Sequence, residues 1–499
     1  MLNRICIAAL GLGVLTRLMS GAASVDEPGP TARGQRPPGF SGEAIPFPPG
    51  QRVFTHIPSS AGGEEGIAVG VLFPRQPRYT HGAPVAINVA GGMLPGGARG
   101  GLDYVGLGFV EIHFAFPGGG QGAAERSGGE YDFRGPKCIR ALADVILFAT
   151  GRIADKDGRR ISELNRRLAV LTNNCGIIGS SHGGNTCGLA MALHGREFAD
   201  LAWYASMESP YGEGVANIEA GGRESGMNPA YDPRTGCLDL SRLAWSADLS
   251  PGMLGRRMSV PWDSFKGAFF FDLDGDGQFN ADKDFPANCC VGDAGTGVKA
   301  WYSPRILAEA ERRHLVRGQR PDHIPSLPES KEFWHYRDAA PSIPDAVRNC
   351  TNLAVIVYAN ERDHVQAAPD HAHILIQVEG FRQASARFVR LNPDRSYVER
   401  IVASRPGSGP TRAEQAPDRF PDNPAGKAFD RTNIASALEP ARFPVQPYMQ
   451  AAVCELADRT QANQWAANLD AVLYPSAPWQ ASPGPLGQRR NPPPEKAPR

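Results

Sequence analysis

The chain has 499 residues, more than one ordinary domain, although a single core with insertions also fits this length. Hydrophobic residues make up 41% and charged residues 21%, a balance typical of a globular protein. Lys plus Arg equals Asp plus Glu at 52 each, so the net charge is zero and the composition gives no basis for a nucleic-acid partner, which needs a basic surface.

The first 24 residues have the pattern of a secretory signal. Arg4 precedes a short apolar run, Ile5–Thr16, and small residues follow at 21–24. A membrane anchor is the alternative, but Arg17 interrupts the run well before the roughly 20 apolar residues that a span needs. No later segment is long and apolar enough to span a bilayer. We therefore expect a secreted or periplasmic protein without a membrane span in the mature chain.

The cysteines agree with export. Eight lie beyond the signal segment, and disulfides are expected in an oxidising compartment, although eight cysteines allow 105 pairings. No paired C-x-x-C occurs, so a thiolate metal site is not expected. The eight are Cys138, Cys175, Cys187, Cys237, Cys289, Cys290, Cys350 and Cys454.

Beyond a Pro/Gly-rich linker at 25–50, strand-like and helix-like segments alternate over 51–209. The expected strands are Gly66–Phe73, Pro84–Ala90, Gly108–Phe116, Cys175–Ile178 and Leu201–Ser206. The expected helices are Cys138–Thr150, with Gly151 as its stop, and Asn185–Leu193. Such alternation predicts an α/β fold with a mostly parallel sheet flanked by helices.

The alternation stops at residue 210 and resumes near 346. We interpret 210–345 as a large insertion that forms a cap or lid, and 346–405 as the second part of the core. The expected elements of that second part are a strand at Leu353–Ala359, a helix at Ala368–Ala384 and a strand at Ala386–Leu391. A C-terminal extension at 406–480, with a helix at Pro447–Asp458, and a disordered tail at 481–499 follow.

The segment Gly179-Ser180-Ser181-His182-Gly183 matches G-x-S-x-G and lies between an expected strand and an expected helix. A serine on such a tight turn is held in a strained conformation that exposes its hydroxyl, and the flanking glycines avoid collisions with neighbouring backbone. The N–H of His182 would face a developing oxyanion. The alternative is a Gly/Ser-rich turn that only connects two elements. We predict Ser181 as a nucleophile.

This pattern resembles the α/β-hydrolase superfamily of esterases, lipases and prolyl-oligopeptidase-like peptidases, over residues 65–210 and 346–400. The resemblance implies a second oxyanion donor on a glycine-bearing loop after an early strand. Ala90-Gly91-Gly92-Met93 stands there, so Gly92 and Met93 are the candidates. The loop lacks the leading histidine of the lipase H-G-G-G form.

The resemblance also implies an acid after a late strand, and Asp363 fits that place. The alternative for Asp363 is a surface ion pair. The histidine expected after the last strand is missing, because no histidine follows His373. Three explanations remain. His364 is the base, or His371 or His373 reaches back from the next helix to act as the base. In the third, the site lacks a base, and the serine hydroxyl is then a poor nucleophile. We take His364 as the candidate base.

An acidic loop in the insertion resembles an EF-hand or dockerin-type calcium loop. Position 12, where Glu or Asp is expected, holds Lys283, and a solvated acidic turn is the alternative. A structural Ca²⁺ is expected here and no organic cofactor. The predicted ligands are Asp272, Asp274, Asp276, Gln278, Asn280 and Asp284.

The leading functional hypothesis is a secreted serine hydrolase that acts on a small-molecule or polymeric ester, or, as a weaker reading, on a peptide. The first alternative is a non-catalytic α/β-hydrolase-fold protein that binds a ligand or partner in the same cleft. A calcium-stabilised extracellular adhesion or scaffold module is the third.

Overall fold

The computed structural model describes most of the chain between Arg52 and Trp465. The described residues are 52–99, 104–198, 200–212, 219–222, 226–249, 267–293, 298–316, 324–359, 363, 371–403 and 445–465. The predicted signal segment, linker and tail at 1–24, 25–50 and 481–499 therefore lie outside the described residues.

The core is a mixed sheet with the strand order β1-β2-β5-β3-β6-β7-β17-β18. β2 runs antiparallel to β1 and β5, and every pair from β5 to β18 along this order is parallel. In chain order the strands are β1 (Arg52–Ser59), β2 (Gly63–Leu72), β3 (Ala83–Val89), β4 (Gly96–Gly97, antiparallel on β5), β5 (Val110–Ala115), β6 (Val170–Ser180), β7 (Leu201–Met207), β17 (Ala354–Tyr358) and β18 (Phe388–Leu391). This confirms the predicted α/β fold with a mostly parallel sheet flanked by helices; β1 and β4 are additional strands that the sequence pattern did not reveal.

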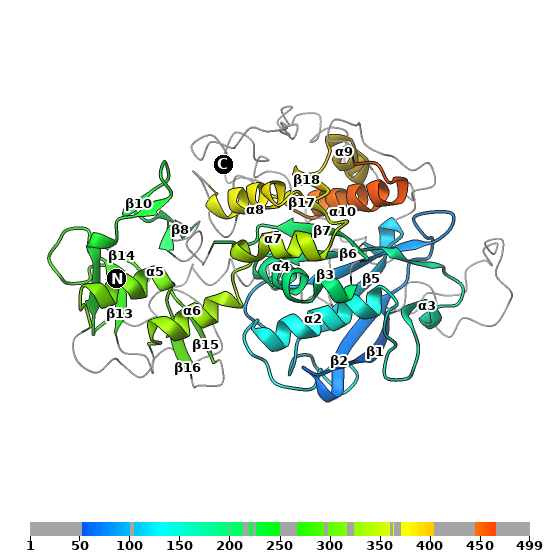
Figure 1. Ribbon diagram of the computed structural model, residues 1–499, viewed down its shortest axis with the longest axis horizontal. Helices are drawn as coiled ribbons and strands as arrows, with labels where there is room; N and C mark the ends of the chain where they lie inside the picture. The colour runs from blue at the N-terminus through cyan, green and yellow to red at the C-terminus, as the bar shows by residue number, and fades with distance from the viewer. Residues whose placement is uncertain are drawn as a thin grey trace, which may run out of the picture.

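Helices cover both faces of the sheet (Figure 1). One face packs against α2 (Pro136–Ala149), α4 (His182–His194), α7 (Ile343–Asn349) and α8 (Ala372–Gln383), and the other against α9 (Arg395–Ala403) and α10 (Val445–Ala462). Neighbouring residues of one strand serve opposite faces: Ile87 and Ile177 point to α2 and α4, whereas Ala86 and Ile178 point to α10. A short helix, α3 (Ile161–Leu164), precedes β6.

The segment predicted as an insertion has its own small core. The strands that the structure describes there pair with each other, and the helices are α5 (Pro304–Arg312) and α6 (Leu327–His335). Buried Phe269, Phe271 and Tyr302 pack together there, in the lobe at the left of Figure 1. The strands are β8 (Gly221–Gly222), β9 (Gly226–Met227), β10 (Tyr231–Asp232), β11 (Cys237–Leu238), β12 (Leu243–Ser246), β13 (Ala268–Phe271), β14 (Phe285–Pro286), β15 (Cys290–Asp293) and β16 (Val298–Trp301).

The cysteines correct the disulfide prediction. The thiols of Cys138, Cys175, Cys187, Cys237, Cys350 and Cys454 are free. Cys138, Cys175, Cys187, Cys350 and Cys454 are buried on separate elements, where a thiol behaves as a small apolar side chain. An even number of cysteines therefore did not imply pairing.

No helix among the residues that the structure describes is long and apolar enough to cross a membrane.

The C-terminal helix α10 is fixed to the sheet by a buried ion pair. Arg78 Nε and Nη2 donate to the two carboxylate oxygens of Asp458 at 2.7 and 2.8 Å. The hydroxyls of Tyr79 and Tyr397 donate to the same carboxylate at 2.8 and 3.0 Å. Arg78 and Asp458 are fully buried, so each charge depends on its partner.

We expect Asp458→Ala to lower the free energy of unfolding by about 3–5 kcal/mol, because it removes the carboxylate that pairs with the fully buried Arg78 guanidinium. Asp200→Ala is the control: it breaks the exposed Arg152–Asp200 pair and should cost less than about 1 kcal/mol. Urea unfolding at pH 7 measures both. Equal losses in the two variants would contradict the role of the buried pair.

Candidate active site

Ser181 lies on the turn between β6 and α4, as predicted. Its φ is 50° and its ψ is −128°, a combination that few residues other than glycine adopt. The turn is held by the Ser181 N–H, which donates to Met207 O at 2.7 Å, and by the Gly184 N–H, which donates to Ser181 O at 2.9 Å. This is the geometry of a nucleophile elbow.

Two glycines allow the backbone to approach this turn. A Cβ on Gly183 would lie 2.5 Å from Val89 O, and a Cβ on Gly91 would lie 2.9 Å from Ser181 Cβ. Any other residue at either position would push α4 or the loop after β3 away from the turn. The loop that carries Gly91 is therefore in direct contact with Ser181.

The predicted oxyanion donors lie on α4 and on the loop after β3, next to Ser181 and Gly91 in the chain. His182 is the first residue of α4, where main-chain N–H groups have no partner within the helix. Gly92, with a φ of 70°, and Met93 continue from Gly91. The partly buried Met93 side chain packs against Trp301, Phe333 and Trp334 of the insertion. The insertion thus contacts the loop beside the nucleophile.

Asp363 follows β17 and is fully buried, as is His373 in the first turn of α8. Asp363 Oδ2 lies 2.7 Å from His373 Nε2, and His373 Nδ1 is buried with no hydrogen-bond partner among the described residues. His371 precedes α8 at a φ of 42°, and burial lowers its pKa to about 4. His364 lies outside the described residues, and His373 is a described imidazole within hydrogen-bond distance of Asp363.

Two further residues at this edge of the sheet were not predicted. Glu208 follows β7, is buried, has a φ of 45° and donates its N–H to Tyr358 O at 3.2 Å. Asn392 follows β18, where the family resemblance implies a histidine, and its Oδ1 accepts from the Ala359 N–H at 2.9 Å. Because carboxyl ends of parallel strands share one edge, polar residues directly after each strand were the signal that could have identified both.

Two buried arginines, Arg134 and Arg337, act electrostatically on His182. Arg134 donates from Nη2 to Gly91 O and Leu94 O, at 3.2 and 2.9 Å. Arg337 donates to Phe133 O and Asp132 O, and burial lowers its pKa to about 10. Their charges add to the effect of burial on His182, whose pKa falls to about 3. The imidazole of His182 is therefore neutral at every physiological pH.

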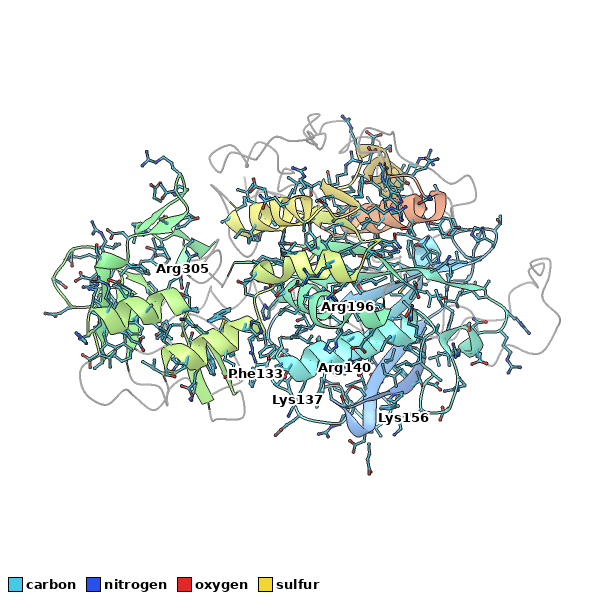
Figure 2. All side chains as sticks on the ribbon, in the orientation of Figure 1. Phe133, Lys137, Arg140, Lys156, Arg196 and Arg305 are labelled. Atoms are coloured by element: carbon cyan, nitrogen blue, oxygen red, sulfur yellow. The ribbon has the colours of Figure 1, made fainter. Side chains whose placement is uncertain are left out.

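The end of α6 is fastened to the core beside the elbow. Arg337 reaches the carbonyl of Phe133, which Figure 2 labels where the insertion meets the core near α2. Asn185 of α4 accepts from the Ala339 N–H at 2.9 Å, and Asp338 accepts from the Gly212 N–H at 2.9 Å. These bonds fix the insertion relative to the nucleophile at this end.

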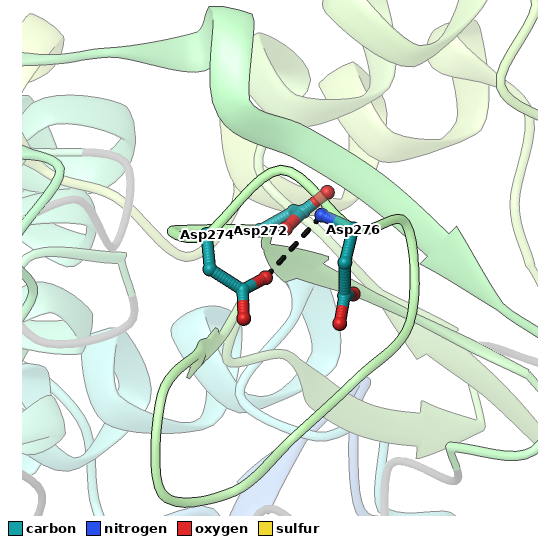
Figure 3. Close-up of side chains that lie close together, drawn as sticks. All are labelled: Asp272, Asp274 and Asp276. Carbon is teal, nitrogen blue, oxygen red and sulfur yellow. Dashed lines mark hydrogen bonds between the residues drawn. The ribbon is translucent and has the colours of Figure 1, made fainter.

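The predicted calcium loop brings three carboxylates together. Ligand atoms of Asp272, Asp274 and Asp276 lie within 4.8 Å of one another (Figure 3). Lys283 Nζ donates to Asp274 at 2.7 Å and lowers its pKa, so the residue at position 12 supplies a positive charge.

The other predicted ligands of this loop support its backbone instead. Asp284 accepts from the N–H groups of Leu273 and Asn280, at 2.9 and 2.7 Å. Asn280 accepts from the Asp282 N–H at 3.0 Å, and the Gln278 N–H donates to Asp276 at 2.7 Å. Among the carboxylates of the predicted ligand set, those of Asp272, Asp274 and Asp276 converge.

No known family model matches the sequence, and none of the curated proteins does. Among solved structures, the chain is similar to a thermostable carboxyl esterase from Bacillus coagulans (12% identity, 68% of this chain, 88% of that chain, TM-score 0.30). Carboxyl esterase 2 from the fungus Tuber melanosporum is 10% identical, over 72% of this chain and 79% of that chain, with a TM-score of 0.31. A puromycin hydrolase is 13% identical, over 69% of this chain and 34% of that chain, with a TM-score of 0.31. At such low scores the likeness says nothing about chemistry, and the fold class follows from the strand order.

The lowered pKa of His182 predicts a loss of stability in acid. Between pH 6.5 and about 3 the unfolded chain binds a proton on His182 that the folded chain does not, so the contribution is full above pH 6.5 and falls as the pH drops. We expect His182→Asn to lose less stability than the unsubstituted protein between pH 7 and 4, measured by urea unfolding. His194→Asn, at the other end of α4, is the control, and equal slopes in all three proteins would contradict the prediction.

Proposed function

We propose that the chain is a serine hydrolase that cleaves carboxylic esters through an acyl-enzyme on Ser181. The observation that carries this proposal is the strained backbone of Ser181 between a strand and a helix N-terminus. Strain of this kind costs on the order of 1–3 kcal/mol and persists where function requires it. We also propose that the chain is exported, on the pattern of its first 24 residues.

Ser181 Oγ attacks the ester carbonyl carbon while a histidine accepts its proton. The tetrahedral intermediate then releases the alcohol, which takes that proton, and water hydrolyses the acyl-enzyme to the free acid. The N–H groups of His182, Gly92 and Met93 are the proposed donors to the oxyanion. Two of them lie on the loop that Gly91 brings against Ser181.

His373 is the base that the described contacts favour. Its Nε2 is 2.7 Å from Asp363, so the carboxylate orients the ring and stabilises the imidazolium, and Nδ1 is the nitrogen left to accept a proton. His364, the residue favoured by sequence, stays the alternative.

A ligand-binding protein without a catalytic base is the second candidate. Asn392 stands where the resemblance implies the histidine, and the Asp363–His373 pair is fully buried. A purely structural ion pair would have the same contacts. Covalent labelling separates the two functions.

We expect a fluorophosphonate probe to label the purified protein and to leave Ser181→Ala unlabelled, since only an activated serine reacts. His373→Gln should reduce the labelling rate by about 100-fold or more, whereas His364→Gln should leave it within about threefold. Asp363→Asn should resemble His373→Gln. The intact mass of the labelled protein, purified after export, would also identify the first residue of the mature chain and so test the predicted signal segment.

Ser180→Ala is the matched control, because it removes a buried hydroxyl next to Ser181 without touching the reacting atom. A folded protein that is not labelled would favour the binding protein. Loss of labelling in His364→Gln alone would assign the base to His364.

We propose, separately, that the acidic loop of the insertion binds Ca²⁺ as a structural ion. Asp272, Asp274 and Asp276 would hold it, in place of the Lys283 ammonium. The exposed loop lacks an acidic twelfth residue, which suggests the roughly 10⁻⁴–10⁻³ M affinity of extracellular calcium modules.

Calcium at about 5 mM should raise the melting temperature, and Asp276→Asn should abolish the rise because it removes one carboxylate. Lys283→Glu should strengthen binding by completing the ligand set. Asp232→Asn, in another turn of the insertion, is the control. An unchanged melting temperature with calcium in both the unsubstituted protein and Lys283→Glu would rule out the site.

A further inference from the structure

Arg134 occupies a costly position close to the nucleophile. It lies on the loop between β5 and α2, with a φ of 67°, directly after Phe133 with a φ of 53°. Two successive non-glycine residues in the left-handed region cost on the order of 1–3 kcal/mol each. The Arg134 side chain is also buried, with 1% of its surface exposed. The fold therefore holds this side chain in place against a considerable penalty.

The guanidinium binds both ends of the loop that carries two proposed oxyanion donors. Nη2 donates to Gly91 O at 3.2 Å and to Leu94 O at 2.9 Å. Gly92 and Met93, the proposed donors, are the two residues between them. The guanidinium carbon also lies 4.1 Å from the centre of the Phe116 ring, which fixes the plane of the group.

The charge of Arg134 is not neutralised by an ion pair. Nε and Nη1 are buried without a hydrogen-bond partner, and no carboxylate among the described residues forms an ion pair with Arg134. Burying an uncompensated charge costs several kcal/mol, and its attraction for a nearby anion is strong in so dry a surrounding. An excess positive charge therefore lies against the loop where the oxyanion of the proposed reaction would form.

We propose that Arg134 is a positioning residue that fixes Gly91–Leu94 for oxyanion binding and adds positive potential there. This inference rests on the proposed function. Arg134 stabilises the transition state and not the ester in its ground state, because the negative charge on the oxygen exists only after attack by Ser181. Arg134 touches no reacting atom and acts through the N–H groups of Gly92 and Met93.

The test compares Arg134→Lys and Arg134→Met with Arg52→Met on hydrolysis of a p-nitrophenyl ester. Arg52 is the matched control, because its Nη1 also donates to a carbonyl, Ala98 O at 2.7 Å, but it contacts neither Gly91 nor Leu94. We expect Arg134→Met to lower kcat by about 100-fold or more with KM within about threefold, the size of losing one oxyanion donor. Arg134→Lys should fall between, because it keeps the charge and loses the two-carbonyl geometry.

Added guanidinium ion, with Arg134→Ala, separates positioning from general loss of structure. The ion should restore part of kcat in Arg134→Ala and none in Arg52→Ala. A folded Arg134→Met or Arg134→Lys with the kcat of Arg52→Met overturns the inference and leaves the hydrolase intact. A rise in KM with unchanged kcat overturns it as well, because Arg134 would then bind the ground state.

If Arg134→Met does not fold, the Arg134→Lys result and the guanidinium rescue decide. An unsubstituted protein that neither hydrolyses the ester nor reacts with the fluorophosphonate defeats the proposed function itself. That outcome is distinct from the one in which the protein is active and substitution of Arg134 does not change kcat.

Discussion

The backbone of Ser181 is the constraint on which the site depends. A φ of 50° is possible there because hydrogen bonds from β7 and α4 hold the turn on both sides. The same turn needs Gly183 against Val89 and Gly91 against Ser181. The position of the Ser181 hydroxyl therefore depends on the two neighbours of β6 in the sheet, because β3 supplies Val89 O and β7 supplies Met207 O to this turn.

Positive charge gathers around this turn. Arg134 and Arg337 are buried, donate to main-chain carbonyls and lie against the aromatic rings of Phe116 and Phe333. Both arginines act electrostatically on His182, which is neutral. The carboxyl groups of Asp363 and Glu208 follow the next two strands, β17 and β7, at the same edge. Such a separation of cationic and anionic groups suits a reaction in which a proton leaves a serine while an oxyanion forms.

The insertion is part of this site and not a separate module. Its aromatic residues Trp301, Phe333 and Trp334 pack on Met93, and Arg337 joins its last helix to the loop before α2. The loop beside Ser181 is thus contacted by a segment whose small strands are stabilised by their own core. The buried Arg78–Asp458 pair holds helix α10, which packs on the opposite face of the sheet.

The sequence by itself determined the fold class, most core elements and the position of Ser181 between a strand and a helix. The apolar runs in β3 and β6 and the G-x-S-x-G pattern are local signals. The hydrophobic period of a strand and the residues that a tight turn requires both depend on neighbours in the chain. Only the tertiary structure decided that Asp363 contacts His373, that Arg134 reaches Gly91, and that Cys138, Cys175, Cys187, Cys350 and Cys454 stay unpaired. These contacts join residues on different elements, and the spacing of residues along a chain does not encode the distances between elements that a packed sheet brings together.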